Sequence, residues 1–222
     1  MLRKLFQLIA FLIIVVFVVV TLSFSAKESR NTTCNSIEVI FSKNDQIQID
    51  RQEIIRLVKS SDAKLIGKQL TKINTDHIEK DIEKHQAVYK AEVYTITAKD
   101  TASYYGILGV KVKHREPIAR IMSSSGSYYL DRFGEKIPVS VNYSANVLVV
   151  TGNFSEEYAR DKLLPFVLFI ENDNFWKAQT EQVHVENQEE IILTPLVGDH
   201  LIDIGTVEDY EKKLGNMKAF YE

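Results

Sequence analysis

The stretch LFQLIAFLIIVVFVVVTLSF, residues 5–24, contains no charged residue, and sixteen of its twenty positions are Leu, Ile, Val or Phe. A helix rises about 1.5 Å per residue, so this stretch spans roughly 30 Å, the thickness of the hydrocarbon core of a bilayer. A helix also satisfies its own backbone hydrogen bonds, which lipid does not do. We therefore expect one transmembrane helix over Leu5–Phe24, in contact with the lipid bilayer.

The sequence around this span also bears on whether it is cleaved and on which side of the membrane each end lies. A cleaved signal peptide usually has a shorter apolar core, of roughly 7–15 residues, before small residues at the cleavage site. Residues 23–25 (SFS) offer such a site, but the uninterrupted apolar length favours an uncleaved anchor. Arg3 and Lys4 precede the span, whereas the charges that follow it nearly cancel. The positive-inside rule then predicts that residues 1–4 lie inside and the rest of the chain outside the cytoplasm.

Charge and cysteine content limit the classes of function that fit the rest of the chain. The 222 residues include 27 basic and 30 acidic ones, and no basic stripe is present, so nucleic acid is not an expected partner. The single cysteine, Cys34, has no partner for an internal disulfide, and we interpret it as a tolerated thiol in a linker. The external domains must then be held together by their apolar cores.

The first part of the chain after the span alternates between strand and helix periodicity. Residues 25–35 are polar and aperiodic, which indicates a linker. The elements that follow are a strand at 37–41, helices begun by Asp50 and Asp76, and strands at 88–96 and 108–112. In the last strand Leu108, Val110 and Val112 alternate with polar or small residues, which predicts one buried face. The expected order is therefore strand, helix, helix, strand, strand.

The second part of the chain predicts more strands and two helices. A hairpin over residues 128–137 has Gly134 in its turn, and Ser155 is expected to begin a helix that Pro165 either kinks or enters in its first turn. The remaining expected elements are strands at 147–150, 175–186, 190–193 and 201–204, and a helix at 207–222. The chain is thus expected to be α+β, with a βααββ domain at 36–122 and a mixed, mostly antiparallel β-domain with flanking helices at 123–222.

One serine motif offers a catalytic interpretation. Residues 61–64 (SDAK) fit the S-x-x-K pattern, in which Ser61 would be the nucleophile and Lys64 its base. Residues 144–146 (SAN) fit a second element of that pattern, but the third element, K-T-G, is absent. A membrane-anchored serine acyl-transfer enzyme is therefore an alternative hypothesis. Short patterns of common residues also arise by chance, which favours a polar helix end at this position.

No other residue pattern points to catalysis. The five histidines lack metal-ligand spacing, and no phosphate-binding glycine loop or C-x-x-C is present, so we expect no metal, no cofactor and no small-molecule substrate. Asp81 and His85, one helical turn apart, are interpreted as a solvated pair. These absences favour a binding scaffold, because exposed sheet edges can bind a partner by adding a strand.

Several stretches of the chain resemble one known family. Residues 85–93 (HQAVYKAEV) are similar to the V-x-x-A-x-V entry to a POTRA strand, and residues 106–121 (GILGVKVKHREPIARI) to the L-x-V-x-V-x-x-R-x-P-x-A strand that follows it. Residues 129–138, 175–182 and 198–205 resemble parts of the β-domain of the bacterial division proteins FtsQ/DivIB. The resemblance covers nearly the whole chain, including the short inside tail and the single span.

The resemblance implies a non-enzymatic, single-pass scaffold of the bacterial divisome, in the cell inner membrane with its domains in the periplasm. In that family the POTRA domain faces upstream division proteins, and the β-domain binds FtsB and FtsL, which regulate septal peptidoglycan synthesis. A POTRA protein of another envelope pathway is the remaining alternative.

The resemblance also suggests where a partner binds. The FtsB contact in the family resembles strand addition at the far edge of the β-domain, with help from the adjacent helix. The family has a further strand after the helix expected at 207–222, and the chain ends at Glu222, so we expect the last strand to be missing or the docking edge to be altered. The candidate docking residues are Leu201, Ile202, Asp203, Ile204, Leu214 and Tyr221. Core packing is the competing interpretation for each, and it is favoured for Leu214.

Overall fold

The structure, a computed structural model, describes Ile9 and residues 11–20, 32–43, 45–47, 49–100, 103–141, 143–186 and 190–221. It divides the chain into two compact units. The first comprises Met1–Ile40, Arg51–Glu83 and Ala91–Val112, and the second comprises Phe41–Asp50, Lys84–Lys90 and Lys113–Glu222. Both units combine helices with a sheet, so the expected α+β class is confirmed.

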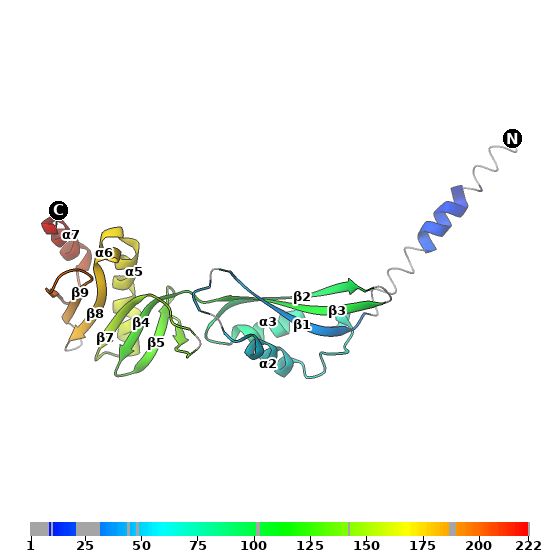
Figure 1. The fold of residues 1–222 in the computed structure, drawn as a ribbon, viewed down its shortest axis with the longest axis horizontal. Coiled ribbons are helices and arrows are strands. Elements are labelled where there is room, and N and C mark those ends of the chain that lie inside the picture. The colour runs from blue at the N-terminus through cyan, green and yellow to red at the C-terminus, as the bar shows by residue number, and fades with distance from the viewer. Residues whose placement is uncertain are drawn as a thin grey trace. The chain divides into compact units, whose positions relative to one another are not determined.

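The first unit is built on a three-stranded sheet with two helices on one face (Figure 1). Its elements are β1 (Cys34–Phe41), α2 (Arg51–Ser61), the 3₁₀ helix η1 (Leu70–Lys72), α3 (Thr75–Glu83), β2 (Val88–Lys99) and β3 (Tyr104–His114). The strand order is β1-β3-β2, and the expected order of strands and helices is confirmed. The alternation expected in β3 is also confirmed, because Leu108, Val110 and Val112 are fully buried whereas Lys111 is exposed.

Two details at the boundaries of these elements differ from the expectations. Cys34 is not in a linker: it is the first residue of β1, it is 1% exposed, and its N–H donates to the carbonyl oxygen of Lys68. Burial raises the pKa of its thiol, so this cysteine behaves as a small core residue. α3 begins at Thr75, and the side chain of Asn74, not that of Asp76, accepts the N–H of His77 at 3.1 Å.

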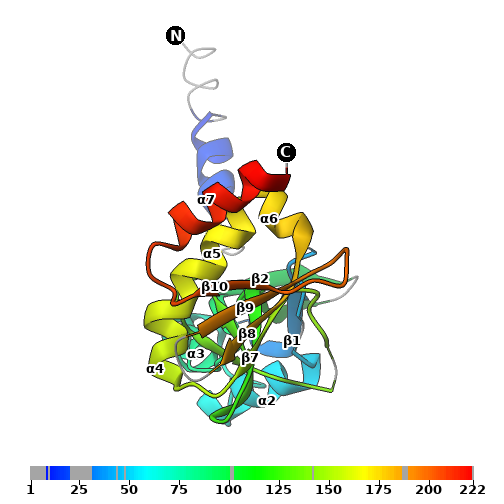
Figure 2. The same ribbon diagram turned by 90° about the vertical axis from the view of Figure 1, so that its left-hand side faces the viewer.

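The second unit is built on a seven-stranded sheet in the order β10-β9-β8-β7-β4-β5-β6. Figure 2 shows β10, β9, β8 and β7 following one another in this order. The strands are β4 (Pro117–Ser123), β5 (Gly126–Asp131), β6 (Lys136–Pro138), β7 (Leu148–Gly152), β8 (Thr180–Glu186), β9 (Glu190–Pro195) and β10 (Ile202–Gly205). β7 is parallel to both β4 and β8, and the other neighbouring pairs are antiparallel. The expected division between residues 122 and 123 differs from this arrangement, because β4 pairs with β5 and β7.

The second unit also contains helices, and those between β7 and β8 supply the crossover that this parallel pair requires. The helices are α4 (Glu156–Tyr158), the π-helix η2 (Ala159–Leu163), α5 (Leu164–Asn172), α6 (Asn174–Gln179) and, after β10, α7 (Tyr210–Tyr221). The side chain of Ser155 accepts the N–H of Tyr158, as expected for the cap. Pro165 lies in the first turn of α5, directly after the π-helix, which confirms the expectation for that residue.

The core of the second unit lies between these helices and one face of the sheet. Val150 and Val183 of the sheet, Phe166 and Ile170 of α5 and Leu214 of α7 are all fully buried in it. The expected hairpin is confirmed: β5 and β6 are antiparallel, and Gly134 in the turn has φ +80°, a value that favours glycine.

One expected strand begins as a helix instead. Phe175–Gln179, expected to start a strand that runs to Glu186, belongs to α6, and β8 begins only at Thr180. The carboxylate of Asp173 accepts the N–H groups of Phe175 at 2.8 Å and Trp176 at 3.1 Å. This N-terminal cap overrides the preference of the aromatic residues for a strand.

The expected span Leu5–Phe24 lies only partly within the described residues. Residues 11–20 are helical, and their apolar side chains are exposed, with Phe11 and Phe17 each 67% accessible. Within the described part of the chain, no helix has the length and apolar character needed to cross a membrane.

Candidate functional site: a docking surface

β10 is the outermost strand of the seven-stranded sheet. Ile202 and Ile204 are buried in the core, whereas Asp203 is exposed and its Oδ1 accepts the N–H of Gly205 at 2.8 Å. β10 pairs with β9 on one side, and on its other side no strand of the described chain pairs with it. That edge of the sheet therefore presents backbone groups that an added strand can use.

Tyr221, near the end of α7, attaches this helix to the segment that leads into β10. Its hydroxyl lies 2.6 Å from Nε2 of His200. Its ring centroid lies 5.7 Å from that of Phe175 and 6.5 Å from that of Trp176. The residue is 42% exposed, so part of the ring remains accessible to a partner. Leu214, in contrast, is fully buried and supports α7 from inside.

The segment between β9 and β10 carries exposed apolar residues that were not among the sequence-based candidates. Leu196 is 61% exposed, Val197 is 70% exposed, and Leu201, which was a candidate, is 66% exposed. An apolar pair directly between Pro195 and Gly198 was the available sequence signal. We call Leu196, Val197, Leu201 and Tyr221 the tip patch. Exposed apolar groups next to an unpaired sheet edge are typical of a protein-binding surface.

Asp173 joins the two helices beneath the tip patch. Besides capping α6, its Oδ2 lies 3.3 Å from Nζ of Lys218 in α7. The pKa of Asp173 is lowered, chiefly by the backbone N–H of Trp176, with further contributions from Phe175 and Lys218. The ionised carboxylate thus holds α6 and the end of α7 together. It thereby also keeps the ring of Tyr221 in contact with the rings of α6.

The free edge of β2, in the first unit, is closed by side chains of α3. Oε1 of Glu79 accepts the N–H of Val93 at 2.7 Å, and Oε1 of Glu83 accepts the N–H of Ala91 at 3.2 Å. The two glutamates lie four residues apart and therefore on one face of the helix. An added strand would need these N–H groups, so the carboxylates block pairing along this part of β2.

Two other sheet edges are protected in different ways. Along β1, Cys34 exchanges backbone hydrogen bonds with Gly67 and Lys68, and the guanidinium of Arg51 donates to the carbonyl oxygen of Val39. β6, at the far end of the seven-stranded sheet, has three residues and ends in Pro138. Among the edges formed by described residues, β10 is thus the one with the least protection.

The S-x-x-K motif does not form a catalytic pair in the structure. The hydroxyl of Ser61, at the end of α2, donates to Oδ2 of Asp81 at 2.6 Å, and that carboxylate also lies 3.5 Å from Nε2 of His77. Lys64 donates its backbone N–H to Asp62 in the following turn. The motif therefore behaves as a polar helix end, because the serine is bonded to an acid and not to the lysine.

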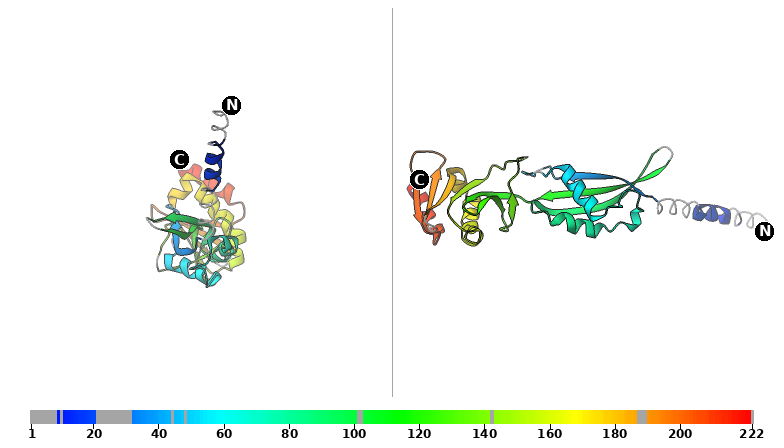
Figure 3. Two further views of the ribbon diagram at one scale, coloured as in Figure 1. Left: turned by 90° about the vertical axis from the view of Figure 1, so that its right-hand side faces the viewer. Right: turned by 90° about the horizontal axis from the view of Figure 1, so that it is seen from below.

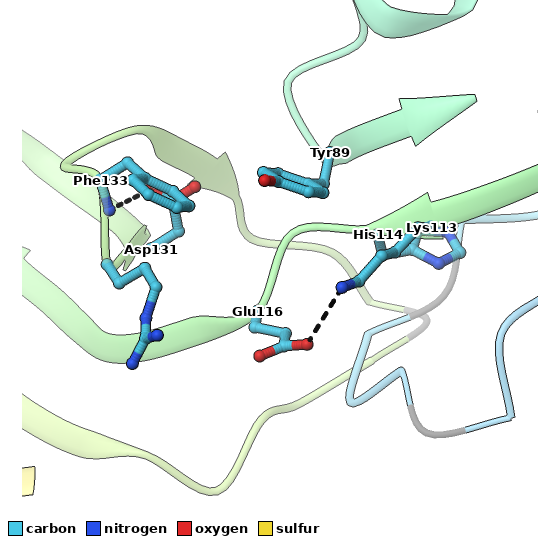
Figure 4. A pocket seen from close by; sticks show the side chains of 7 residues that line it. Tyr89, Lys113, His114, Glu116, Asp131 and Phe133 are labelled. Atoms are coloured by element: carbon cyan, nitrogen blue, oxygen red, sulfur yellow. Dashed lines mark hydrogen bonds and ion pairs between the residues drawn. The ribbon is translucent and has the colours of Figure 1, made fainter. Parts of the chain in front are cut away.

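A hollow of about 190 Å³ in the second unit combines exposed aromatic rings with charges (Figure 4). Its lining residues are Tyr89, Lys113, His114, Glu116, Asp131, Arg132 and Phe133. The rings of Tyr89 and Phe133 are parallel within 10°, with centroids 6.0 Å apart. Nζ of Lys113 lies 3.9 Å from Glu116, and Asp131 pairs with Arg115 at 2.8 Å.

Both ring nitrogens of the histidine in this hollow make structural contacts. His114 is buried, its Nδ1 lies 2.7 Å from Oδ2 of Asp45, and its Nε2 accepts the N–H of Ile49 at 3.0 Å. With both ring nitrogens bonded, His114 fastens the 41–50 segment and offers no general base. In the part of the chain that the structure describes, no three His, Cys, Asp or Glu side chains are grouped as metal ligands.

Comparison with known families gives one match for each part of the chain. Residues 116–222 match the family model described as FtsQ/DivIB, C-terminal related, and residues 32–101 match the POTRA-like domain. A search of the curated proteins finds no match. The second match covers most of the three-stranded unit, and the first covers the seven-stranded sheet with its helices.

Proposed function

We propose, from the premise that this chain belongs to the FtsQ/DivIB-related proteins, that it is a non-enzymatic scaffold linking early and late proteins of the bacterial divisome. The POTRA-like and C-terminal domains support a role in cell division in general. The more specific parts of the proposal concern the membrane anchor, the partners that bind the docking surface and the effect of binding on septal peptidoglycan synthesis.

The proposed anchor is the helix Leu5–Phe24, with residues 1–4 in the cytoplasm, residues 25–33 as a linker that leads into β1 and both domains in the periplasm. Its support is the uncharged twenty-residue stretch itself and the two basic residues that precede it. The exposed apolar side chains of the helical residues 11–20 agree with a lipid environment.

The proposed docking surface is the outer edge of β10 together with the tip patch, and its occupant is an FtsB/FtsL-type division protein. The observation that carries this proposal is the contrast between the edges: β2 is capped by carboxylates, whereas no strand among the described residues pairs with the outer side of β10. In this arrangement the partner strand pairs with the backbone of Ile202–Ile204 and contacts the side chains of Leu201, Asp203 and Tyr221. The buried side chains of Ile202, Ile204 and Leu214 hold the edge in place.

Copurification of the full chain with an FtsB-type partner tests the docking proposal. Leu201→Asp combined with Tyr221→Ala is expected to weaken the complex at least roughly tenfold, because both changes remove apolar contacts at the centre of the interface. Ile66→Asp is the matched control, since Ile66 is a 52% exposed residue of the first unit. Equal retention of the partner by all three chains would contradict the proposed surface.

The enzyme alternative has its own test. The hydroxyl of Ser61 donates to Asp81 and not to Lys64, so the lysine does not activate it as a nucleophile in this structure. Labelling of the chain by a β-lactam probe, lost on Ser61→Ala, would replace the scaffold proposal with an acyl-transfer enzyme that uses Ser61 and Lys64. Without such labelling, the scaffold proposal stands.

A further inference from the structure

The turn end of the β2–β3 hairpin carries exposed aromatic and apolar side chains, well separated along the chain from the docking surface. Tyr94 and Ile96 are each 37% exposed, and Tyr104 is 41% exposed. Tyr105 and Ile107 of β3 are half-buried. All five lie in the first unit, and we call them the hairpin patch.

Four of the five residues share the sheet face opposite the helices. A Cβ atom on Gly109 would lie 2.5 Å from the ring of Tyr94, so this ring lies directly over Gly109. Gly109 stands between Leu108 and Val110, which are buried on the helix side, and successive residues of a strand point to opposite faces. Ile96, two residues after Tyr94, shares its face, and so do the two half-buried residues of β3 by the same alternation.

The chain enters the first sheet beside this hairpin end. The N–H of Gly106, the third residue of β3, donates to the carbonyl oxygen of Thr33 at 3.0 Å, directly before β1 begins. The hairpin turn is closed by the bond from the N–H of Asp100 to the carbonyl oxygen of Ser103 at 2.9 Å. Figure 3 shows β2 and β3 running past the helices of this unit toward that turn.

We infer that the hairpin patch lies in the headgroup region of the bilayer that holds Leu5–Phe24. This inference rests on the anchor proposed above. Residues 25–33 join the span to the contact with Gly106, and nine residues reach at most about 30 Å. The hairpin continues beyond Gly106 toward its turn, so its side chains lie within reach of the membrane surface.

The chemistry of the hairpin patch fits a lipid headgroup layer. Tyrosine has an apolar ring and a polar hydroxyl, and it is enriched at the membrane–water interface. Nζ of Lys99 lies 5.5 Å from the ring centroid of Tyr104, and this long side chain can extend its charge to lipid phosphates. Glu92, on the same face as Tyr94, is 3.3 Å from Lys111, which offsets its negative charge.

Site-specific fluorescence quenching in vesicles tests the contact. The full chain is reconstituted into phosphatidylcholine–phosphatidylglycerol vesicles that contain a lipid with a nitroxide on its headgroup. Tyr94→Trp, with Ile96→Trp as a second reporter, is compared with Tyr89→Trp, a 45% exposed position at the other end of β2. The parent chain gives the background of Trp176, its single tryptophan, which is 1% exposed.

The expected result is headgroup quenching at least threefold stronger for Tyr94→Trp and Ile96→Trp than for Tyr89→Trp. Flotation of the chain with vesicles but equal quenching at all positions would overturn the lipid contact alone. Shielding of Tyr94→Trp from aqueous iodide without nitroxide quenching would also overturn it, because a protein would then cover this face. Failure of the parent chain to float with the vesicles would overturn the anchor, and the hairpin contact with it.

Discussion

The outer edges of β2 and β10 differ in whether side chains bond their outward backbone N–H groups. Both strands end a sheet, and both could pair with a strand from another chain. On β2, Glu79 and Glu83 of α3 accept the outward N–H groups of Val93 and Ala91. On β10, the exposed carboxylate of Asp203 accepts the backbone N–H of Gly205 within its own strand end.

This difference shows how a chain can direct strand addition to one of two sheets. Two acids at helical spacing i, i+4 are enough to occupy alternate N–H groups of a neighbouring strand, because both spacings are close to 6 Å. Near β10, the side chain of Lys213 in α7 donates to the carbonyl oxygen of Thr206, directly after the strand, at 2.8 Å, and the tip patch beside the strand is apolar. Changes in the first unit should act on the β2 edge, and changes at Asp173 should act on the helices that support the β10 edge.

The largest effect is expected from Val110→Asp in β3. Val110 is fully buried, and an unpaired carboxylate there should cost more than about 3 kcal/mol, enough to unfold the first unit and remove the β2 edge. Because the chain forms two compact units, the second unit should keep its fold and its partner. Circular dichroism should show the loss of structure, and Trp176 fluorescence should remain that of a buried residue.

The control for this change is Thr95→Asp, which places the same charge at an exposed position of β2. It should leave the circular dichroism spectrum unchanged. Simultaneous exposure of Trp176 in Val110→Asp would show that the two sheets unfold together, and the edges could then not be treated as independent.

A smaller effect is expected when the closed edge is opened. Glu79→Ala with Glu83→Ala removes both acceptors and should lower the free energy of unfolding by roughly 2 kcal/mol. Amide hydrogen exchange should become faster at Ala91 and Val93, and the chain should self-associate at high concentration through the exposed edge.

Glu79→Gln with Glu83→Gln provides the matched control for the open edge. Each glutamine keeps a carbonyl oxygen that can accept the same N–H group, so protection should largely return. If the alanine and glutamine variants exchange these amides at equal rates, the carboxylate contacts do not close the edge.

The sequence predicted the elements that depend on local patterns. The alternation of β3, the turn at Gly134 and the cap at Ser155 are each determined by a few neighbouring residues, and all are confirmed. Leu201 and Tyr221, two of the candidates for docking, lie exposed on the tip patch.

The features that the sequence did not predict depend on contacts between distant residues. The closure of β2 requires α3 to lie along that strand, and the contact between Tyr221 and Trp176 joins positions 45 residues apart. Phe175 and Trp176 have strand propensity, and only the cap from Asp173 places them in a helix. Cys34 looked like part of a polar linker because its burial comes from the packing of β1, not from its sequence neighbours.

Asp173→Ala is expected to destabilise α6 and the end of α7, which support the β10 edge. This change removes the cap of α6 and the contact with Lys218, and we expect a loss of about 1–2 kcal/mol in the free energy of unfolding. Trp176 emission should shift to longer wavelength, since its helix and the Tyr221 ring loosen together. Ser155→Ala, at the other capped helix of this unit, should cost a similar amount without moving the emission.

The smallest effect is expected from acid. The pKa of Asp173 is lowered in the folded chain, mainly by the N–H of Trp176, so its ionised form stabilises the fold at every pH above the unfolded value near 3.9. As pH falls below about 4 and then through the lower folded pKa, protonation removes this contribution. The Trp176 emission of the parent chain should therefore shift only in this acidic range.

Asp173→Asn isolates the contribution of this one carboxylate, because the amide oxygen can still cap α6 but does not titrate. Its Trp176 emission should show a smaller change between pH 5 and pH 3 than that of the parent chain. An identical acid transition in both chains would assign the change to other carboxylates. The support of the β10 edge would then depend on the hydrogen bonds of the cap and not on its charge.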